Sequence, residues 1–154
     1  MDLQRYAAVV GDANYVIAIN RFLIEDLGWL PKAVAITDAL YPEQLDGLAQ
    51  KIVPLPSGIQ PHVFFSTNTN DIRKLIAAYW HEQQGGFGKY ANPLSPAFVI
   101  GSALDRELAK DIGAAHLSVS FPVANRAVIG RGYTGFSGGL YLIEDMVSTI
   151  IIGR

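Results

Sequence analysis

The sequence contains no cysteine, and only three of its 154 residues are histidine. Without cysteine the chain can form no disulfide, zinc ribbon or thiolate-held cluster, and it has no cysteine nucleophile. The histidines are His62, His81 and His116; they lie far apart in the sequence, and none stands in a pattern with serine and aspartate that is typical of a nucleophile triad. We therefore predict no catalytic residue and no metal site in this chain.

Charge is also sparse, at 17% of residues with a formal net charge of −2, and the sequence has no basic run. Nucleic-acid-binding proteins carry a basic patch or stripe, so we predict no nucleic-acid partner. Half of the residues are hydrophobic and the mean hydropathy is +0.23. Part of the apolar surface is therefore expected to meet another protein chain.

Long hydrophobic runs are missing as well. A membrane-spanning helix needs about 20 apolar residues. The longest candidate run, Met146–Ile152, is much shorter and follows Glu144 and Asp145. Residues 1–5 have neither the basic start nor the long apolar stretch of a secretory signal. We predict a cytoplasmic protein that does not span a membrane.

What the sequence does have is a regular alternation of strand and helix patterns. Five short apolar runs are typical of buried strands. Each run is followed by a segment that is typical of a helix, either because its apolar residues recur at helical spacing or because a glycine stands at its end. The predicted strands are 5–10, 33–37, 63–66, 97–100 and 116–120, and the predicted helices are 13–27, 41–52, 72–84, 103–112 and one from Ser137 or Gly138 to Ile150.

This alternation predicts an α/β fold in which right-handed crossovers build a parallel sheet covered on both faces. We expect a Rossmann-like three-layer sandwich of one domain, residues 1–154, with a five-stranded sheet. The long irregular stretch 85–96 suits a crossing from one half of the sheet to the other, which favours the strand order 3-2-1-4-5.

In such a sheet a ligand binds outside the carboxyl ends of the strands where the strand order reverses. This places Gly11, Asp12 and Asn14 opposite Gly101 and Ser102 as weak candidates for cofactor binding. The sequence has no Gly-x-Gly-x-x-Gly and no Walker A lysine, and the negative charge of Asp12 at the helix start would repel a phosphate. We favour capping of the first helix by Asp12 and predict no cofactor in this chain.

The stretch that folding alone explains least is the glycine-rich segment 130–139. Glycines this dense allow positive φ and close backbone approach. Packing against a neighbouring subunit is the favoured interpretation, and a ligand is the alternative. The interface candidates are Arg126, Arg131, Tyr133, Gly135, Phe136 and Gly138.

The same segment carries a family resemblance. The segment resembles the C-terminal end of the subunits of the nitrogenase component 1 family. The resemblance lies in Phe121-Pro122, then Arg126, then Gly132-Tyr133-Thr134-Gly135-Phe136-Ser137-Gly138 leading into a helix. Three further pieces extend the resemblance over nearly the whole chain, namely Gly11-Asp12 after the first strand, the helix Phe22–Gly28, and Val99–Ser102 followed by Asp105–Ala109.

The resemblance implies that the chain is the C-terminal domain of a longer subunit. Family members have three such domains and hold an iron–sulfur cluster through cysteines of the first, none of which is present here. Family α-type subunits carry a histidine ligand of the metal–sulfur cofactor just before the glycine-rich turn. Residues 120–126 contain none, which indicates a β-type subunit that does not ligate this cofactor.

The implied role is that of scaffold and subunit interface in ATP-driven reduction of dinitrogen, with electrons from an iron protein. The implied partners are an α-type subunit and the remaining domains of the same subunit, and the isolated domain is predicted to be inactive. Two alternatives within the family are a cofactor-assembly scaffold and a protochlorophyllide reductase subunit. Outside it, a stand-alone small-molecule-binding domain remains open.

Overall fold

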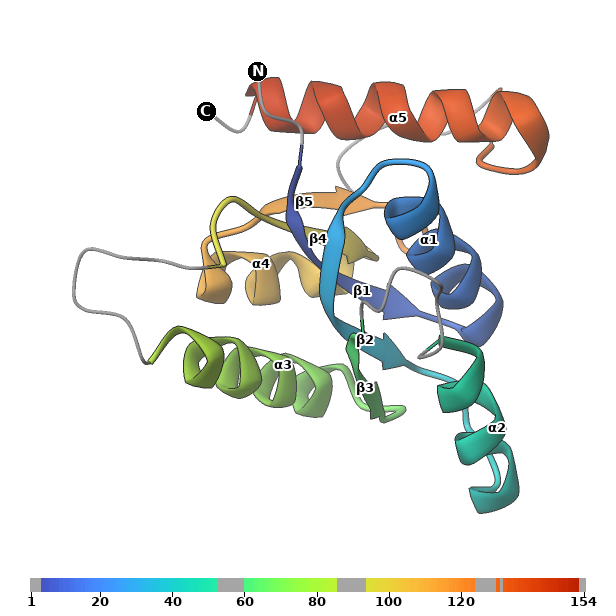
Figure 1. Ribbon diagram of the computed structural model, residues 1–154, viewed down its shortest axis with the longest axis vertical. Helices are drawn as coiled ribbons and strands as arrows, with labels where there is room; N and C mark the ends of the chain where they lie inside the picture. The colour runs from blue at the N-terminus through green and yellow to red at the C-terminus, as the bar shows by residue number, and fades with distance from the viewer. Residues whose placement is uncertain (1–3, 53–59, 86–93, 124–129, 131, 153–154) are drawn as a thin grey trace.

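A computed structural model of the chain describes residues 4–52, 60–85, 94–123, 130 and 132–152. Strands and helices alternate along these residues (Figure 1). The strands are β1 (Tyr6–Gly11), β2 (Leu30–Ile36), β3 (His62–Phe65), β4 (Ala97–Gly101) and β5 (Ala115–Ser118). The helices are α1 (Ala13–Glu25), α2 (Pro42–Ile52), α3 (Thr69–Gln84), α4 (Arg106–Ile112) and α5 (Gly135–Ile152), and a 3-10 turn, η1 (Ala103–Asp105), precedes α4.

The five strands form one sheet in the order β3-β2-β1-β4-β5, and all four neighbouring pairs are parallel. This confirms both the predicted α/β class and the predicted strand order. The central strand β1 is buried from Ala7 to Gly11, which its uninterrupted apolar run requires in a sheet covered on both faces.

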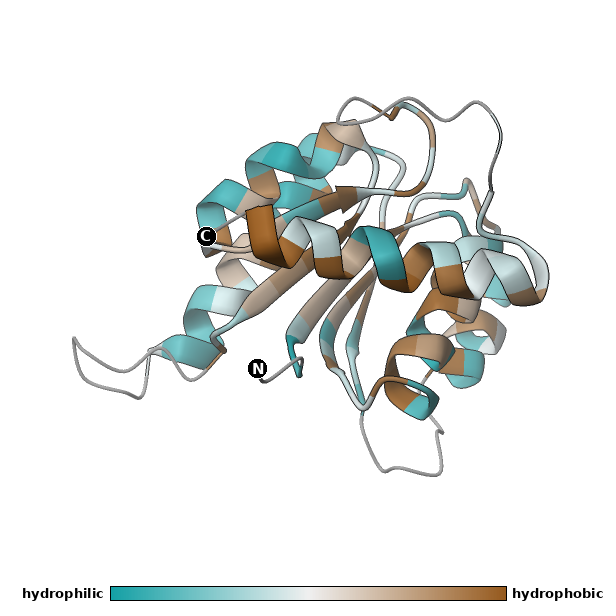
Figure 2. Cartoon of the chain, turned by 90° about the horizontal axis from the view of Figure 1, so that it is seen from above, coloured by the Kyte–Doolittle hydropathy of each residue, from teal (hydrophilic) through white to brown (hydrophobic). Residues whose placement is uncertain are grey.

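Helices α1, α2 and α5 cover one face of the sheet, where Trp29 packs edge-on against Phe98 with ring centroids 5.2 Å apart. Side chains of α1 and α5, including Leu23 and Met146, complete this core. Figure 2 shows α5 lying across the molecule, with apolar stretches at several places along the helix.

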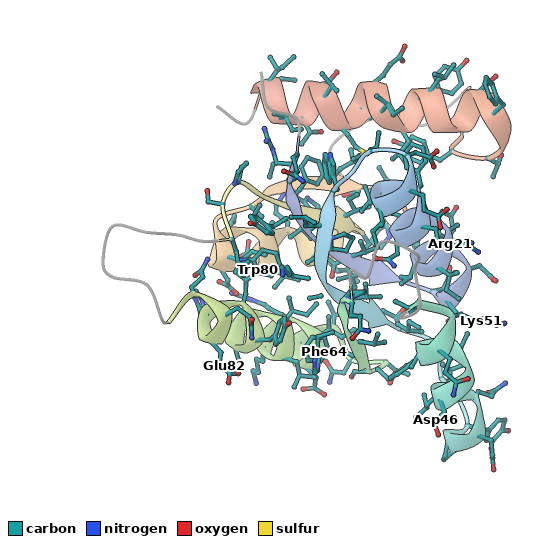
Figure 3. The ribbon with its side chains drawn as sticks, in the orientation of Figure 1. Arg21, Asp46, Lys51, Phe64, Trp80 and Glu82 are labelled. Carbon is teal, nitrogen blue, oxygen red and sulfur yellow. The ribbon has the colours of Figure 1, made fainter. Side chains whose placement is uncertain are left out.

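Helices α3 and α4 cover the opposite face. The fully buried Trp80 packs there with Ile76 and Leu108. In Figure 3 Trp80 points from α3 towards the sheet, whereas Glu82, two residues later, points away from it. The two helices are also joined at the surface, because the guanidinium of Arg73 donates to both carboxylate oxygens of Asp111, at 2.6 and 3.0 Å.

Several element ends differ from the sequence-based prediction for identifiable reasons. Strand β2 begins at Leu30, three residues early, because Leu30 and Pro31 also pair with β1, and a register shift then skips Lys32 before the pairing continues at Ala33. Strand β5 ends at Ser118, because the amides of Val119 and Ser120 both donate to the carbonyl of Gly101 and the chain leaves the ladder.

Candidate functional site

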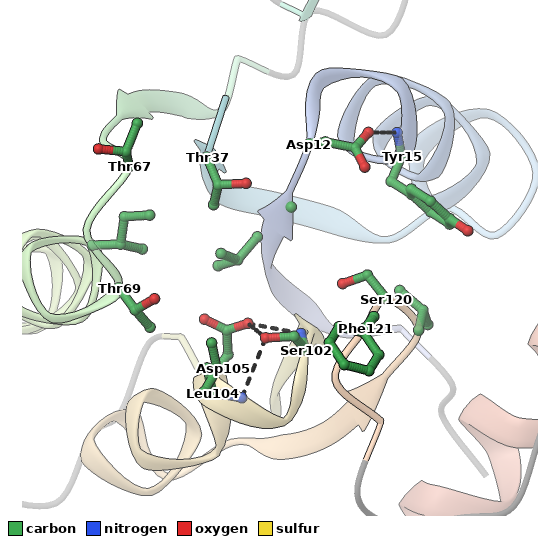
Figure 4. A pocket seen from close by; sticks show the side chains of 14 residues that line it. Asp12, Tyr15, Thr37, Thr67, Thr69, Ser102, Leu104, Asp105, Ser120 and Phe121 are labelled. Atoms are coloured by element: carbon green, nitrogen blue, oxygen red, sulfur yellow. Dashed lines mark hydrogen bonds between the residues drawn. The ribbon is translucent and has the colours of Figure 1, made fainter. Parts of the chain in front are cut away.

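A crevice of about 430 Å³ opens at the carboxyl ends of the strands (Figure 4). It lies where the chain order reverses between β1 and β4, which is the ligand-binding position of open parallel sheets. Its volume is within the range of small-molecule sites. The lining residues come from β1, α1, α3, η1 and the segments that follow β2, β3 and β5; the polar ones are Asp12, Tyr15, Thr37, Thr67, Thr69, Ser102, Asp105 and Ser120.

Carboxylates of the chain itself occupy the helix starts around this crevice. Asp12 accepts a hydrogen bond from the amide of Tyr15 at 3.1 Å and caps α1, as predicted. The amide of Ala13 donates to Asp38 at 2.7 Å, across the gap between the ends of β1 and β2. In dinucleotide-binding folds such amides hold a phosphate. Here each of these two amides already has an anionic partner.

The start of η1 is organised in the same way. Both the amide and the hydroxyl of Ser102 donate to Asp105 Oδ2, at 2.7 and 3.0 Å, and the Ser102 hydroxyl accepts from the amide of Leu104. This reciprocal arrangement is a capping box. Gly101 makes room for it, because a Cβ at this position would overlap the Asp105 carboxylate.

Burial changes the titration of the groups around Ser102. Desolvation raises the pKa of Asp105 above its ordinary value, and the hydrogen bonds from Ser102 oppose this rise. His116 donates from Nε2 to the carbonyl oxygen of Ser102 at 2.9 Å, and desolvation lowers the pKa of its ring. The ring therefore bonds to backbone and not to the Ser102 hydroxyl, so these three residues do not form a nucleophile–base pair.

The predicted candidates fall into two groups. Gly11, Asp12 and Ser102 line the crevice, whereas Gly101 and the exposed Asn14 are not among its lining residues. Sequence reasoning missed Asp105 and the threonines at positions 37, 67 and 69. The spacing Ser102-x-x-Asp105 was a usable signal, because it is that of a capping box. The threonines carry no such signal, since Thr37 follows β2 whereas Thr67 and Thr69 lie about 30 residues later, between β3 and the start of α3.

The glycine-rich turn folds back on the helix that follows it. The Tyr133 hydroxyl donates to Asp145 Oδ2 at 2.6 Å, and a Cβ on the buried Gly138 would overlap the backbone of Tyr133. Gly135 has a φ of +69°, a conformation that favours glycine. Arg126 and Arg131 lie outside the described residues, and their interface role stays a prediction.

The first turn of α5 and its far end expose large apolar side chains. Phe136 is 92% exposed and Ile152 is 83% exposed, and Leu140 and Ile151 are exposed between them. By length and composition alone α5 could cross a membrane. That property is weak support for a membrane location, because core helices of globular proteins share it.

A metal ion or an iron–sulfur cluster is held by several donor side chains that lie close together. They contain no group of three or more histidine, cysteine, aspartate or glutamate side chains that could hold a metal ion. The whole sequence also lacks cysteine. The residues of this chain therefore do not fit an iron–sulfur cluster.

Residues 3–151 match the family model described as nitrogenase component 1 type oxidoreductase. The nitrogenase molybdenum-iron protein beta chain of Methanococcus maripaludis is 25% identical over 155 residues, which cover 96% of this chain and 28% of the relative. The beta chain of the same name from Frankia alni is 25% identical over 146 residues, covering 94% and 24%. The chain thus spans about a quarter of the length of these relatives.

A solved structure described as nitrogenase Cp1 at pH 6.5 has the same fold. It superimposes with a TM-score of 0.68 at 19% identity, and the match covers 97% of this chain and 29% of that one.

The close approach at Gly138 generates a stability prediction. Gly138→Ala should lower the free energy of unfolding by about 1–3 kcal/mol, because the new methyl group overlaps backbone that cannot move freely. The matched control is Gly139→Ala, whose Cβ would meet only Phe22 Cε2, at 3.9 Å. This control should be neutral or stabilising by up to about 1 kcal/mol, since alanine favours helix. Urea unfolding of both variants tests the contrast, and equal stabilities would contradict it.

The occupied helix starts generate a binding prediction. ATP, NADH and FMN should bind no tighter than about 1 mM, because the carboxylates of Asp12 and Asp38 take the amides that a phosphate would use and also repel it. Isothermal titration calorimetry of each compound into the chain measures this. A micromolar dissociation constant for any of the three would contradict the prediction and support a stand-alone nucleotide-binding domain.

Proposed function

Because the chain belongs to the nitrogenase component 1 type oxidoreductase family, we propose that it acts as the C-terminal domain of a β-type subunit. Its role is that of scaffold and subunit interface in ATP-driven reduction of dinitrogen, with electrons delivered by an iron protein, in the cytoplasm. The observation that carries this proposal is the match over residues 3–151, together with beta-chain relatives of which the chain covers only 24–28%.

A scaffold role agrees with the chemistry of the residues. The iron–sulfur cluster and the metal–sulfur cofactor of the parent protein are proposed to be held outside this chain, because its own side chains do not fit them. The crevice contains neither histidine nor cysteine among its lining residues. What this chain contributes is a rigid sheet and a helix with an apolar outer side.

The proposed interface is centred on α5. Its inner side, with Leu142, Met146 and Ile150, packs on the core of the chain, and its outer side exposes Phe136 and Leu140. The proposed occupants of the outer side are the α-type subunit and the remaining domains of the same subunit. Both curated relatives described above are named as nitrogenase beta chains, which favours a nitrogenase over an assembly scaffold or a protochlorophyllide reductase subunit.

The domain assignment is tested most directly at the encoding locus. We expect the DNA upstream of the Met1 codon to continue in frame into a segment that encodes cysteine-bearing domains of the same family. A gene product that is shown by mass spectrometry of cell extracts to be the 16.7-kDa chain alone would contradict the assignment. It would favour the stand-alone binding domain.

The interface is tested by Phe136→Ser in the full-length parent protein. The side chain is 92% exposed, so the substitution should leave unfolding of the 154-residue chain within about 0.5 kcal/mol of the original. It should weaken assembly with the α-type subunit, because a buried aromatic side chain contributes strongly to an interface. Co-purification measured by quantitative gel densitometry reports the assembled fraction.

The matched control is Tyr41→Ser, which removes another exposed aromatic side chain, 74% exposed and placed just before α2. It should leave assembly unchanged. Tyr133→Ser is unsuitable for this purpose, because Tyr133 bonds to Asp145 of its own helix and the substitution would destabilise the chain. Equal assembly of the Phe136 variant and the control would contradict the interface.

A further inference from the structure

We propose that the crevice at the carboxyl ends of the strands binds a small, uncharged polyhydroxylated compound of monosaccharide size. The proposal rests on the side chains that line the crevice and is independent of the role in a larger subunit. It could fail while that role stands, and the reverse also holds.

The first observation is a set of free hydroxyl groups. The hydroxyls of Thr37, Thr67 and Thr69 have no hydrogen-bond partner among the residues that the structure describes, although all three line the crevice. Thr37 directly follows β2, Thr67 lies in the segment after β3, and Thr69 is the first residue of α3. A hydroxyl both donates and accepts, so this side of the crevice suits a ligand that carries several hydroxyl groups.

The second observation concerns acceptors on the carboxylates. Asp12 and Asp105 each use one carboxylate oxygen for the hydrogen bonds that fix the helix starts. Their other oxygens accept nothing from the described residues and can accept from a ligand hydroxyl. Ser102 Oγ already both donates and accepts, so it fixes Asp105 in place without competing for a ligand.

The third observation is an apolar rim. Phe121 is 93% exposed, Leu104 is 58% exposed and Tyr15 is 41% exposed, and all three line the crevice. In Figure 4 Tyr15 and Phe121 lie on one side of the opening, and Thr67 and Thr69 lie on the other. A sugar-like ring offers C–H groups to an aromatic side chain and hydroxyls to polar ones, which matches this division.

Charge selects against anions. The lining residues include two aspartates and no lysine, arginine or histidine. The helix-start amides of Ala13 and Tyr15, which could otherwise attract an anion, are bonded to Asp38 and Asp12. A phosphorylated sugar would therefore be repelled by two carboxylates with no cationic side chain in the lining to offset them, whereas its neutral parent would not.

The test is ligand-observed saturation-transfer NMR of the 154-residue chain with four probes, namely glucose, myo-inositol, glucose 6-phosphate and glucosamine. Glucose or myo-inositol should bind with a dissociation constant in the millimolar range. Glucose 6-phosphate should bind at least about tenfold more weakly than glucose, because of the charge argument. No signal from either neutral probe at 100 mM would overturn the proposal, and so would glucosamine binding tenfold more tightly than both, which would indicate a cation site.

Variants locate the binding. Thr69→Val and Thr37→Val keep the side-chain shape and remove a hydroxyl, and together they should weaken binding at least about fivefold. The control is Ser148→Ala, an exposed hydroxyl on α5, which should leave binding unchanged. Melting curves establish that each variant is folded, and Thr69→Val alone serves if the double variant is not. Unchanged binding in a folded threonine variant would overturn the proposed location.

Discussion

A parallel sheet has to be covered on both faces, and the rest of this molecule is arranged around that requirement. The strand β1 directs Val9 into the core under α1 and α5 and directs Ala8 and Val10 into the core under α3 and α4. Neither face can be left to water without exposing a whole row of apolar side chains. The right-handed crossovers then decide which helices cover which face.

The same geometry gathers the helix starts at one edge of the sheet. Parallel strands all end at this edge, and each following helix begins there with amides that lack an intrahelical partner. In this chain Asp12, Asp38 and Asp105 supply those partners from within. The consequence is chemical as well as structural. An edge whose amides are satisfied by carboxylates has little left for an anion, and what remains free there is hydroxyl groups and aromatic rims.

Local signals explain how much the sequence could predict. The continuous apolar runs made the strands predictable, the glycine at the end of α4 marked the end of that helix, and the long stretch 85–96 indicated the strand order. Asp12 was recognisable from its position as the cap of α1. The bond from Ala13 to Asp38 could not be predicted, because its partners are 25 residues apart and meet only when β1 and β2 pair in register. The start of α5 was predicted two or three residues late, since glycines disfavour helix, whereas the structure packs the Tyr133 backbone closely against Gly138 in that first turn.

The side of α5 that faces away from the sheet differs in polarity from the corresponding side of α3, the other long helix. The outer side of α3 carries charged residues such as Asp71, Lys74 and Glu82, as expected for a side that faces water. The outer side of α5 exposes Phe136, Leu140, Ile151 and Ile152, and Glu144 is the one charged residue that the structure describes as exposed along its 18 residues.

A helix that is apolar on two sides is typical of a position between two packed layers. The sheet accounts for one of those layers, through Leu142, Met146 and Ile150. Under the proposed interface, the other layer would come from protein outside this chain, and the relatives, of which it covers only 24–28%, have the additional length to supply it.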